Sequence, residues 1–191
     1  MRINAMRPKL GVMGSASESG RPDVGTALTE AAANLGRTIA SHEVILLTGA
    51  TTGIVYLVGK TAHDAGAFHI GVSPGSNQIE HEIYFKLPVD ACDSIIYTGF
   101  GLKGRNVVLV RSCDVVIFIA GAMGSLNEFT IAHDEGKIIG CLTGSGGVAD
   151  EADYLISHFA KKHKAQVFQN SDPEKLLTDC FEALKATEKT T

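Results

Sequence analysis

Short apolar runs alternate with longer stretches of helical periodicity along the chain. The runs are rich in Val, Ile and Leu, and such continuous runs are typical of strands that are buried on both faces of a mostly parallel sheet. The pattern predicts a single-domain, doubly wound, Rossmann-like α/β fold with helices on both faces of the sheet. We expect about seven strands, at residues 10–13, 44–48, 69–73, 94–97, 115–119, 138–142 and 166–168.

The stretches between these runs carry the predicted helices. The first begins at Pro22 and Asp23, because proline suits the first turn of a helix and aspartate complements the helix dipole. In the absence of a linker or an internal repeat, residues 9–186 form the predicted domain, between a disordered lead at 1–8 and a frayed tail at 187–191. The first helix continues to residue 41, and others are expected at residues 53–65, 102–112, 125–135, 151–163 and 173–185.

Composition narrows the class of protein. The 191 residues are 45% hydrophobic, which is enough to bury a core without disulfides or a metal. There are 17 Lys and Arg residues against 21 Asp and Glu residues, and the net charge of -4 has the wrong sign for a protein that binds nucleic-acid phosphates. The longest apolar stretch, residues 115–122, is too short to cross a membrane, and the N-terminus lacks the apolar core of a signal peptide. We therefore expect a cytoplasmic protein with no membrane and no nucleic-acid partner.

The sequence predicts neither a metal site nor a reactive cysteine. The cysteines Cys92, Cys113, Cys141 and Cys180 are far apart and lack the paired spacing of a zinc site or a redox dithiol. We interpret them as small core residues. The histidine-containing acidic stretches also lack the i, i+4 histidine pair of a zinc helix.

Glycine-containing turns follow six of the predicted strands. In a parallel sheet the carboxyl ends of the strands share one edge, and ligands bind in the crevice outside it where the strand order reverses. Glycine there lets a ligand approach backbone N–H groups closely, although glycine also serves simply to close tight turns. As a set, the turns favour a site for a phosphate-bearing small molecule. They lie at residues 14–15, 49–53, 73–76, 99–101, 121–125 and 143–147.

Two familiar nucleotide motifs are matched only in part. Residues 99–104 fit the dinucleotide pattern G-x-G-x-x-G, but the next strand runs into Ile119 and Ala120 where the pattern requires an acidic residue. Residues 59–61 resemble the end of a P-loop but lie within a predicted helix. Neither motif indicates its usual nucleotide.

The strongest local signal is the turn Gly121-Ala122-Met123-Gly124-Ser125, which joins a buried strand directly to a helix. Small residues let the backbone wrap an anion, and the helix start offers unpaired N–H groups and a positive dipole end. The Ser125 hydroxyl can donate as well. The sequence therefore predicts that these five residues bind a phosphate group, most simply that of a nucleotide.

Two charged residues are candidates for the same crevice. Glu128 follows the phosphate turn by less than one helical turn, where a carboxylate can also serve only to compensate the dipole. Arg105 lies near the start of the preceding helix, which opens on the same sheet edge, and its alternative is an ordinary exposed arginine. We interpret Lys103 and Arg111 as solvated surface. The shared edge favours Arg105 and Glu128 as functional partners.

These residues resemble the LOG (Lonely Guy) phosphoribohydrolases and their relatives, once labelled lysine decarboxylases. The hallmark of that family is P-G-G-x-G-T-x-x-E, and residues 120–128 occupy it here. Arg105 stands fifteen positions before Ala120, as the family's arginine does before its proline, so Arg105 and Glu128 match the family's catalytic pair. The resemblance spans roughly residues 10–147. It includes two earlier glycine turns, with the phosphate-binding candidates Gly14, Ser15, Gly49, Thr52 and Gly53.

The hallmark is altered at several positions. Ala120 replaces its proline, Ala122 its second glycine and Ser125 its threonine. Asn106 replaces the lysine that follows the arginine. With these departures the chain is similar to a divergent branch, which also resembles the nucleotide-binding-like domain of DNA-processing proteins and molybdenum-cofactor carrier proteins.

The resemblance implies a homodimer that hydrolyses the N-glycosidic bond of a nucleoside 5′-monophosphate and uses no cofactor. Glu128 would stabilise an oxocarbenium-like transition state or activate water, while Arg105 would orient Glu128 and hold the ribose or the phosphate. The alternative, motivated by the altered hallmark, is a non-catalytic carrier or sensor. It would bind a nucleotide-like or molybdopterin-like ligand at the same edge.

Overall fold

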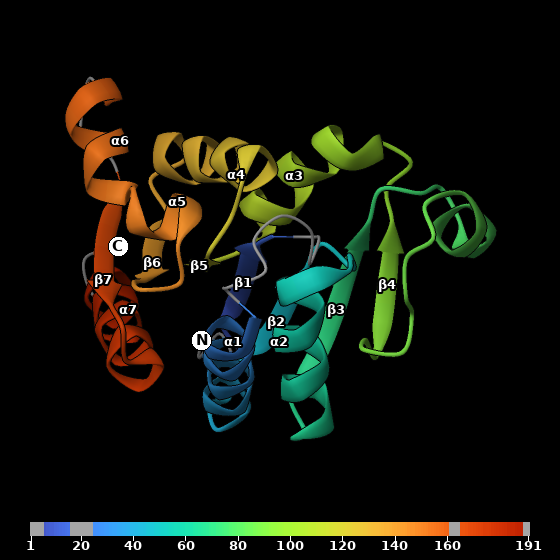
Figure 1. The fold of residues 1–191 in the computed structure, drawn as a ribbon, viewed down its shortest axis with the longest axis horizontal. Coiled ribbons are helices and arrows are strands. Elements are labelled where there is room, and N and C mark those ends of the chain that lie inside the picture. Colours follow the sequence, from blue (N-terminus) through green and yellow to red (C-terminus); the bar gives the residue numbers. More distant parts are fainter. Residues whose placement is uncertain (1–5, 16–24, 161–164, 189–191) are drawn as a thin grey trace, which may run out of the picture.

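The computed structural model describes residues 6–15, 25–160 and 165–188, and within them seven strands form one sheet (Figure 1). Neighbouring strands are parallel, in the order β4-β3-β2-β1-β5-β6-β7. The doubly wound α/β fold expected from the sequence is confirmed. The strands are β1 (Lys9–Gly14), β2 (Ile45–Thr48), β3 (Phe68–Ser73), β4 (Ser94–Tyr97), β5 (Val115–Ile119), β6 (Ile138–Leu142) and β7 (Gln166–Asn170).

Helices cover both faces of the sheet, and each face holds its own core cluster. Leu35 and Ile117 belong to the cluster on one face, and Phe118 and Phe129 to the cluster on the other. Because helices lie on both sides, β5 and β6 are buried throughout, which explains their uninterrupted apolar sequences. The first face carries α1 (Gly25–Ala40), α2 (Gly53–Asp64) and α7 (Pro173–Glu188), and the second carries α3 (Gly101–Ser112), α4 (Met123–Asp134), α5 (Gly147–Asp150) and α6 (Ala152–Phe159).

Several helical segments differ from the expectation. The helix predicted at residues 151–163 is replaced by α5 and α6, because Gly147 begins a helix within the predicted turn and α6 ends at Phe159. The α4 helix begins two residues earlier than predicted. A short π-helix, η1 (Glu80–Tyr84), lies between β3 and β4 where the sequence predicts no helix. So short a segment has no room for a periodic apolar pattern.

Parts of the predicted lead and tail, residues 1–5 and 189–191, lie outside the described residues. The predicted first-helix start at Pro22 and Asp23 also lies outside them. The α7 helix continues to Glu188, beyond its predicted end. No helix in the described parts of the chain is long and apolar enough to cross a membrane.

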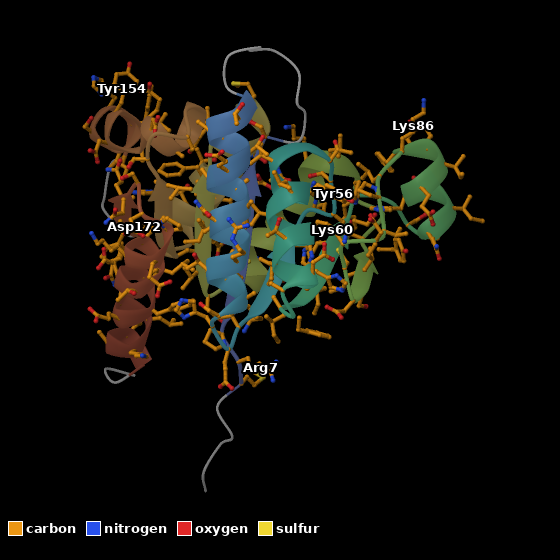
Figure 2. All side chains as sticks on the ribbon, turned by 60° about the horizontal axis from the view of Figure 1, so that its bottom comes forward. Arg7, Tyr56, Lys60, Lys86, Tyr154 and Asp172 are labelled. Atoms are coloured by element: carbon orange, nitrogen blue, oxygen red, sulfur yellow. The ribbon has the colours of Figure 1, made fainter. Side chains whose placement is uncertain are left out.

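The strand order reverses between β1 and β5, where Gly14 lies beside Ile119 at the carboxyl ends of the two strands. From β1 the chain winds outward to β4, then crosses back to β5 and winds the other way to β7. Figure 2 shows Lys86 and Tyr154 toward opposite ends of the molecule, on either side of this reversal. The helices α2, α3 and α4 follow β2, β4 and β5, so they begin at the carboxyl edge of the sheet.

Candidate functional site

The turn after β5 has a left-handed backbone. Ala120 and Gly121 have φ angles of 52° and 108°, and a Cβ on Gly121 would lie 2.7 Å from the Cβ of Ser125. Glycine is therefore required at position 121. The hallmark proline could not occupy position 120 in this conformation, because the proline ring fixes φ near about −65°. The turn thus differs in shape from one that carries the hallmark proline.

Two serine hydroxyls and the start of α5 hold this turn in place. Ser15 Oγ accepts a hydrogen bond from the Gly121 N–H at 3.2 Å, and Ser145 Oγ accepts one from the Ala120 N–H at 2.7 Å. The carbonyl oxygens of Gly121 and Ala120 accept hydrogen bonds from backbone N–H groups of α5 at 3.1 and 3.0 Å. The turn is therefore fixed before any ligand binds.

The first turn of α4 faces the crevice. Ala122 is its N-cap and makes no side-chain cap, and the first turn contains no acidic residue. The Ser125 hydroxyl donates to the Gly14 carbonyl at 2.9 Å and so ties α4 to β1. Because the first N–H groups of a helix have no partner within the helix, those of α4 can serve an anion.

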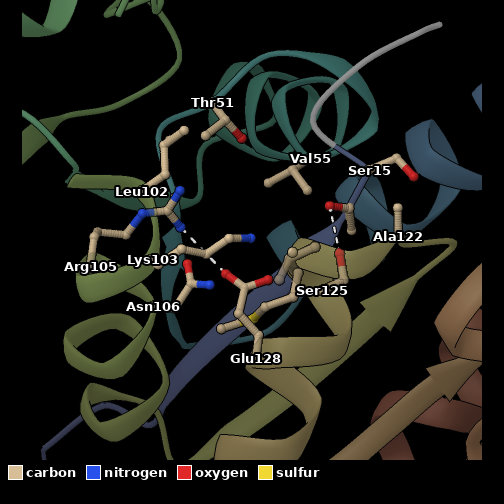
Figure 3. Close-up of a pocket in the computed structure, with 15 residues that line it drawn as sticks. Ser15, Thr51, Val55, Leu102, Lys103, Arg105, Asn106, Ala122, Ser125 and Glu128 are labelled. Atoms are coloured by element: carbon tan, nitrogen blue, oxygen red, sulfur yellow. Dashed lines mark hydrogen bonds and ion pairs between the residues drawn. The ribbon is translucent and has the colours of Figure 1, made fainter.

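Arg105 and Glu128 meet in a cavity of about 260 Å³ beside this helix start (Figure 3). Arg105 Nη1 donates to Glu128 Oε1 at 3.4 Å, and the residues are 5% and 7% exposed. A Cβ on Gly49 would lie 2.6 Å from the guanidinium carbon of Arg105, so only glycine at position 49 leaves room for the guanidinium. The two charged residues singled out in the sequence are therefore side by side at the reversal of strand order.

Burial dominates the electrostatics of this pair. It raises the pKa of Glu128 to about 7, although the positive charges of Arg105 and Lys103 oppose the shift. Burial also lowers the pKa of Arg105, against the attraction of Glu128. Arg105 Nε has no hydrogen-bond partner among the described residues. A buried unsatisfied nitrogen beside a carboxyl group that titrates near neutrality is typical of a functional site rather than of a structural ion pair.

Two further polar residues of α3 belong to the cavity and were missed in the sequence. With its amide nitrogen turned toward Glu128, Asn106 donates to Glu128 Oε1 at 3.1 Å and to the Leu102 carbonyl at 3.0 Å. Lys103 is exposed, as predicted, but it also lines the cavity, and its Nζ lies 3.5 Å from the position of a Cβ on Gly124. The sequence did hold one signal for Lys103: it is a lysine in the first turn of a helix that has no acidic residue there, and a positive charge at a helix start is unfavourable.

The phosphate-binding residues predicted from the sequence divide between this cavity and a larger one of about 1280 Å³. Met123 lines neither cavity within the described residues, and its side chain is 75% exposed. The smaller cavity is lined by Gly14, Ser15, Gly49, Ala122, Gly124 and Ser125. The larger cavity is lined by Ser15, Thr52, Gly53, Gly121 and Ala122.

The larger cavity lies on the other side of the phosphate turn. Its walls include the apolar side chains of Leu28 and Leu57 from α1 and α2, and Lys86 from the segment after η1. Ser15 and Ala122 line both cavities. The two spaces therefore adjoin at the turn, and a ligand bound there can extend to either side.

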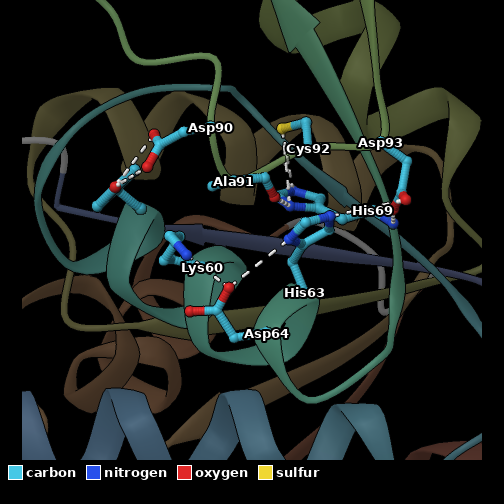
Figure 4. Close-up of polar contacts among 9 residues, drawn as sticks. Lys60, His63, Asp64, His69, Asp90, Ala91, Cys92 and Asp93 are labelled. Atoms are coloured by element: carbon cyan, nitrogen blue, oxygen red, sulfur yellow. Dashed lines mark hydrogen bonds and ion pairs between the residues drawn. The ribbon is translucent and has the colours of Figure 1, made fainter.

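A second buried polar cluster lies around His69 of β3 (Figure 4). His69 Nδ1 donates to the Ala91 carbonyl, and Nε2 accepts a hydrogen bond from Thr48 Oγ at 2.9 Å. The His69 N–H donates to the Asp93 carboxylate at 2.7 Å, and Cys92 Sγ lies 3.7 Å from Nδ1. These contacts fasten the segment before β4 to β2 and β3.

Proximity of Cys92 and His69 does not make this cluster a nucleophilic site. Burial lowers the pKa of His69 to about 4 and raises the pKa of Cys92 to about 12. Near neutral pH the imidazole is uncharged and the sulfur is a thiol, whereas a catalytic cysteine requires a thiolate. Across the described residues, no group of three or more His, Cys, Asp or Glu side chains is placed to hold a metal ion.

The chain belongs to the SLOG cluster4 family, whose model, LDcluster4, matches residues 7–177. This confirms the LOG-like relationship indicated by the hallmark and its place in a divergent branch. An uncharacterized protein of Archaeoglobus fulgidus is 29% identical over 108 residues. That match covers 56% of this chain and 66% of the relative, so the chain spans just under two thirds of its length.

Solved structures are similar over nearly the whole chain. The molybdenum cofactor carrier protein MCP of Chlamydomonas reinhardtii is 28% identical with a TM-score of 0.71, covering 95% of this chain and 99% of that one. The molybdenum cofactor binding protein of Rippkaea orientalis is 30% identical with a TM-score of 0.70, covering 95% and 98%.

The fold also occurs in DNA processing protein A of Streptococcus pneumoniae, with 19% identity and a TM-score of 0.61. That comparison covers 87% of this chain and 60% of the other protein. It gives no support to the expectation, drawn from the acidic charge, that nucleic acid is excluded as a partner.

Proposed function

We propose that this SLOG protein binds a nucleotide-like ligand at the reversal of strand order and hydrolyses the N-glycosidic bond of a nucleoside 5′-monophosphate. The observation that carries the proposal is the cavity in which the start of α4, Arg105 and Glu128 converge. Together these supply an anion holder, an acid–base group and a residue that positions it.

The charge pattern of the helices supports a phosphate in this cavity. First-turn residues of α2, α3 and α4 line it, and none of these helices has an acidic residue in its first turn. By contrast, α6 and α7 carry Asp153 and Glu174 there. A helix start without a carboxylate leaves its positive dipole end uncompensated. A bound phosphate would compensate three such ends at once.

The position of Glu128 suits a reaction at the ribose. It lies four residues after Gly124, or about 6 Å along the helix axis from the proposed phosphate site. In its ionised form Glu128 would accept a proton from water as the water oxygen bonds to C1′. The base leaves with the electron pair of the broken C–N bond and takes a proton from solvent, and Glu128 returns to solvent the proton it removed from water, which yields ribose 5-phosphate and the free base.

A role in binding alone does not account for Glu128. A buried carboxylate repels an anionic ligand and costs energy to desolvate, so a site built only for phosphate would omit it. Its pKa of about 7 instead keeps both protonation states populated near neutrality, as a general acid–base group requires. Arg105 would hold the carboxylate in line with the sugar through Nη1.

The test is release of base from a panel of purine and pyrimidine nucleoside 5′-monophosphates. Wild-type protein should hydrolyse at least one of them, and Glu128→Gln should lower its turnover by about 10²- to 10⁴-fold while ligand binding persists. The matched control is Glu135→Gln at the far end of the same helix, which should leave turnover unchanged. Nucleotide binding without base release from any member of the panel contradicts the hydrolase.

The second candidate is a non-catalytic carrier, which the larger cavity and the similarity to two molybdenum-cofactor proteins favour. A nucleoside monophosphate anchored toward Glu128 would leave that cavity unused. A ligand with groups on both sides of its phosphate would occupy both spaces. The turn and the start of α4 fit the phosphate of a molybdopterin-like cofactor, and the mixed apolar and polar lining of the larger cavity fits its ring system.

Mass spectrometry of small molecules that copurify with the full chain distinguishes the two. A pterin or another phosphate-containing cofactor, retained equally by wild type and Glu128→Gln, supports the carrier. A nucleoside monophosphate enriched in Glu128→Gln supports the hydrolase, because a blocked enzyme retains substrate.

We further propose the cytoplasmic homodimer expected from the sequence. Phe100 and Val107 of the α3 region are 66% and 42% exposed, and such exposed apolar side chains suit a protein interface. Sedimentation velocity should give twice the monomer mass, and Val107→Asp should shift the protein toward monomer. A monomer at all concentrations contradicts this proposal.

A further inference from the structure

The two carboxyl oxygens of Glu128 have different surroundings. Oε1 accepts a hydrogen bond from Arg105 Nη1 at 3.4 Å and, with the Asn106 amide nitrogen turned toward it, a second one from Asn106 at 3.1 Å. Within the described residues no hydrogen-bond donor reaches Oε2. Figure 3 shows this second oxygen directed away from Arg105 and Asn106, toward the side of the cavity on which Ser125 lies. The protein therefore holds one oxygen and leaves the other to the cavity.

The Asn106 amide is itself fixed by further contacts. Asn106 is 3% exposed, and in this orientation its nitrogen also donates to the Leu102 carbonyl at 3.0 Å. Its amide oxygen lies 2.9 Å from the side-chain amide of Asn127 on α4. An amide has two donor hydrogens and one acceptor oxygen, so all of its groups are in use here. Asn106 cannot turn away from Glu128 without breaking hydrogen bonds to both helices.

An amide at position 106 differs in charge from the lysine that it replaces in the LOG pattern. Arg105, Lys103 and Glu128 are the charged residues that line the cavity, and every other residue that lines it in the described part of the chain is uncharged. A lysine at position 106 would add a cation beside Oε1 and favour the ionised carboxylate. A neutral amide can donate both to a carboxylate and to the carbonyl oxygen of a carboxylic acid. Asn106 therefore orients Glu128 without fixing its charge, in keeping with the Glu128 pKa of about 7.

We infer that Asn106 is a positioning residue: with Arg105 it holds Oε1 of Glu128, so that Oε2 is the oxygen that takes a proton from water and returns it to solvent. The inference rests on the proposed hydrolysis for the reaction and adds the atom at which the proton moves. In the neutral acid the proton lies on Oε2, because a hydrogen on Oε1 would point at two donor groups. Oε1 is then the carbonyl oxygen and keeps both of its hydrogen bonds.

The first experiment records infrared spectra of the full chain with isotope-labelled glutamate over a range of pH, and Glu128→Gln identifies the Glu128 bands. In wild type the carbonyl stretch of neutral Glu128 should lie at low frequency, because Oε1 accepts two hydrogen bonds. Asn106→Leu removes one donor, so this band should move to higher frequency and the pKa of Glu128 should rise by about one pH unit. Asn106→Lys should instead lower that pKa by about 1–3 pH units. Asn34→Leu, at an exposed position of α1, is the control and should change neither.

A Glu128 carbonyl band that is high in wild type and does not move in Asn106→Leu overturns the inference, because the proton then lies on Oε1. A Glu128 pKa that is the same in both Asn106 variants as in wild type also overturns it. Circular dichroism and thermal melts report whether each variant folds. If Asn106→Leu does not, Asn106→Asp keeps the shape of the side chain and places a second carboxyl group beside Oε1. The higher pKa of that pair should then exceed the pKa of wild-type Glu128, and an unchanged value overturns the inference.

The second experiment measures the pH dependence of base release from the nucleoside 5′-monophosphate that wild type hydrolyses. Asn106→Leu should lower kcat about tenfold or more, keep KM within about threefold, and move the acid limb of the profile to higher pH. Asn106→Lys should move the acid limb to lower pH. Turnover and a pH profile unaffected by Asn106→Leu contradict the inference and leave the hydrolase intact. The expected infrared bands in a wild-type protein that releases no base contradict the hydrolase and leave Oε2 as the oxygen that carries the proton.

Discussion

The Arg105–Glu128 cavity and the His69 cluster both bury titratable side chains, the first between α3 and α4 at the carboxyl edge of the sheet and the second near the start of β3. Around His69, both ring nitrogens have partners and the backbone N–H is bonded to Asp93. In the cavity, Arg105 Nε has no partner among the described residues, and the Arg105–Glu128 distance of 3.4 Å is long for a charge-assisted hydrogen bond. The hydrogen bonds of the His69 side chain are therefore all made within the protein, whereas those of Arg105 are not.

Whether the buried polar atoms have partners distinguishes a structural cluster from a candidate functional site better than the residue types do. A cysteine beside a histidine would attract attention in any sequence, yet here both are neutral and saturated with contacts. An arginine and a glutamate on neighbouring helices are commonplace, yet here they line a cavity and Arg105 Nε has no partner among the described residues. Buried polar groups that lack partners cost stability, so their presence calls for a functional reason.

The largest effect should come from breaking the complete cluster. His69→Ala removes hydrogen bonds to Thr48 and Ala91 and leaves a void beside Gly59, so the free energy of unfolding should fall by about 3–4 kcal/mol. Phosphate affinity, measured below the unfolding transition, should not change. His63→Ala, at a partly exposed contact with Asp93, is the control and should cost less than about 1 kcal/mol. A loss of phosphate binding in His69→Ala would erase the distinction between the two clusters.

The two regions should also respond to pH in opposite directions. The folded protein holds the Glu128 proton up to a pKa of about 7, above the ordinary value of 4.5, so this contribution to stability is full below about pH 4.5 and is lost as the pH rises to 7. The pKa of His69 is lowered to about 4 from 6.5, so its contribution is present above about pH 6.5 and is lost as the pH falls toward 4.

Glu128→Gln isolates the first of these contributions. Between about pH 5 and about pH 8, the variant should gain up to about 3 kcal/mol of unfolding free energy relative to wild type, because the buried charge no longer forms. Urea denaturation at several pH values measures it, and Glu135→Gln serves as the control. A difference between wild type and variant that is independent of pH would show that Glu128 titrates normally.

A smaller effect is expected at Gly49, whose lack of a side chain leaves room for the Arg105 guanidinium. Gly49→Ala puts a methyl group against the Arg105 guanidinium, so the side chain must shift away from Glu128. We expect a loss of about 1–3 kcal/mol in stability together with weaker phosphate binding. Gly25→Ala, where a Cβ meets nothing within 4 Å, is the control. Unchanged phosphate affinity in Gly49→Ala would indicate that Arg105 does not contact the ligand.

The smallest effect should come from the support beneath the phosphate turn. Ser145→Ala removes the acceptor for the Ala120 N–H, which should cost about 1–2 kcal/mol in stability and a few-fold in phosphate affinity. Ser157→Ala on the exposed side of α6 should change neither. If Ser145→Ala alters stability alone, the turn binds phosphate without needing this serine to hold it.

Much of the fold follows from local sequence, because continuous apolar runs such as β5 and β6 are buried on both faces. The topology then determines that Arg105 and Glu128 face one crevice; the shared sheet edge and the resemblance to the LOG hallmark, rather than spacing alone, were what selected them. Lys103 was missed because its role depends on how close α3 comes to α4, which no short stretch of sequence encodes. The His69 cluster likewise joins β2, β3 and the segment before β4, so it becomes apparent only once the chain is folded.

The backbone at Ala120 has a consequence for how this branch relates to the rest of its superfamily. Because φ at Ala120 is 52°, restoring the hallmark proline there by a single substitution would force the turn to refold, and the bonds to Ser15 and Ser145 would be disturbed with it. Glycine would be accepted at the same position. A proline at position 120 therefore requires a turn of different geometry from the one that Ala120 adopts here, so this single substitution would need accompanying changes at the residues that hold the turn.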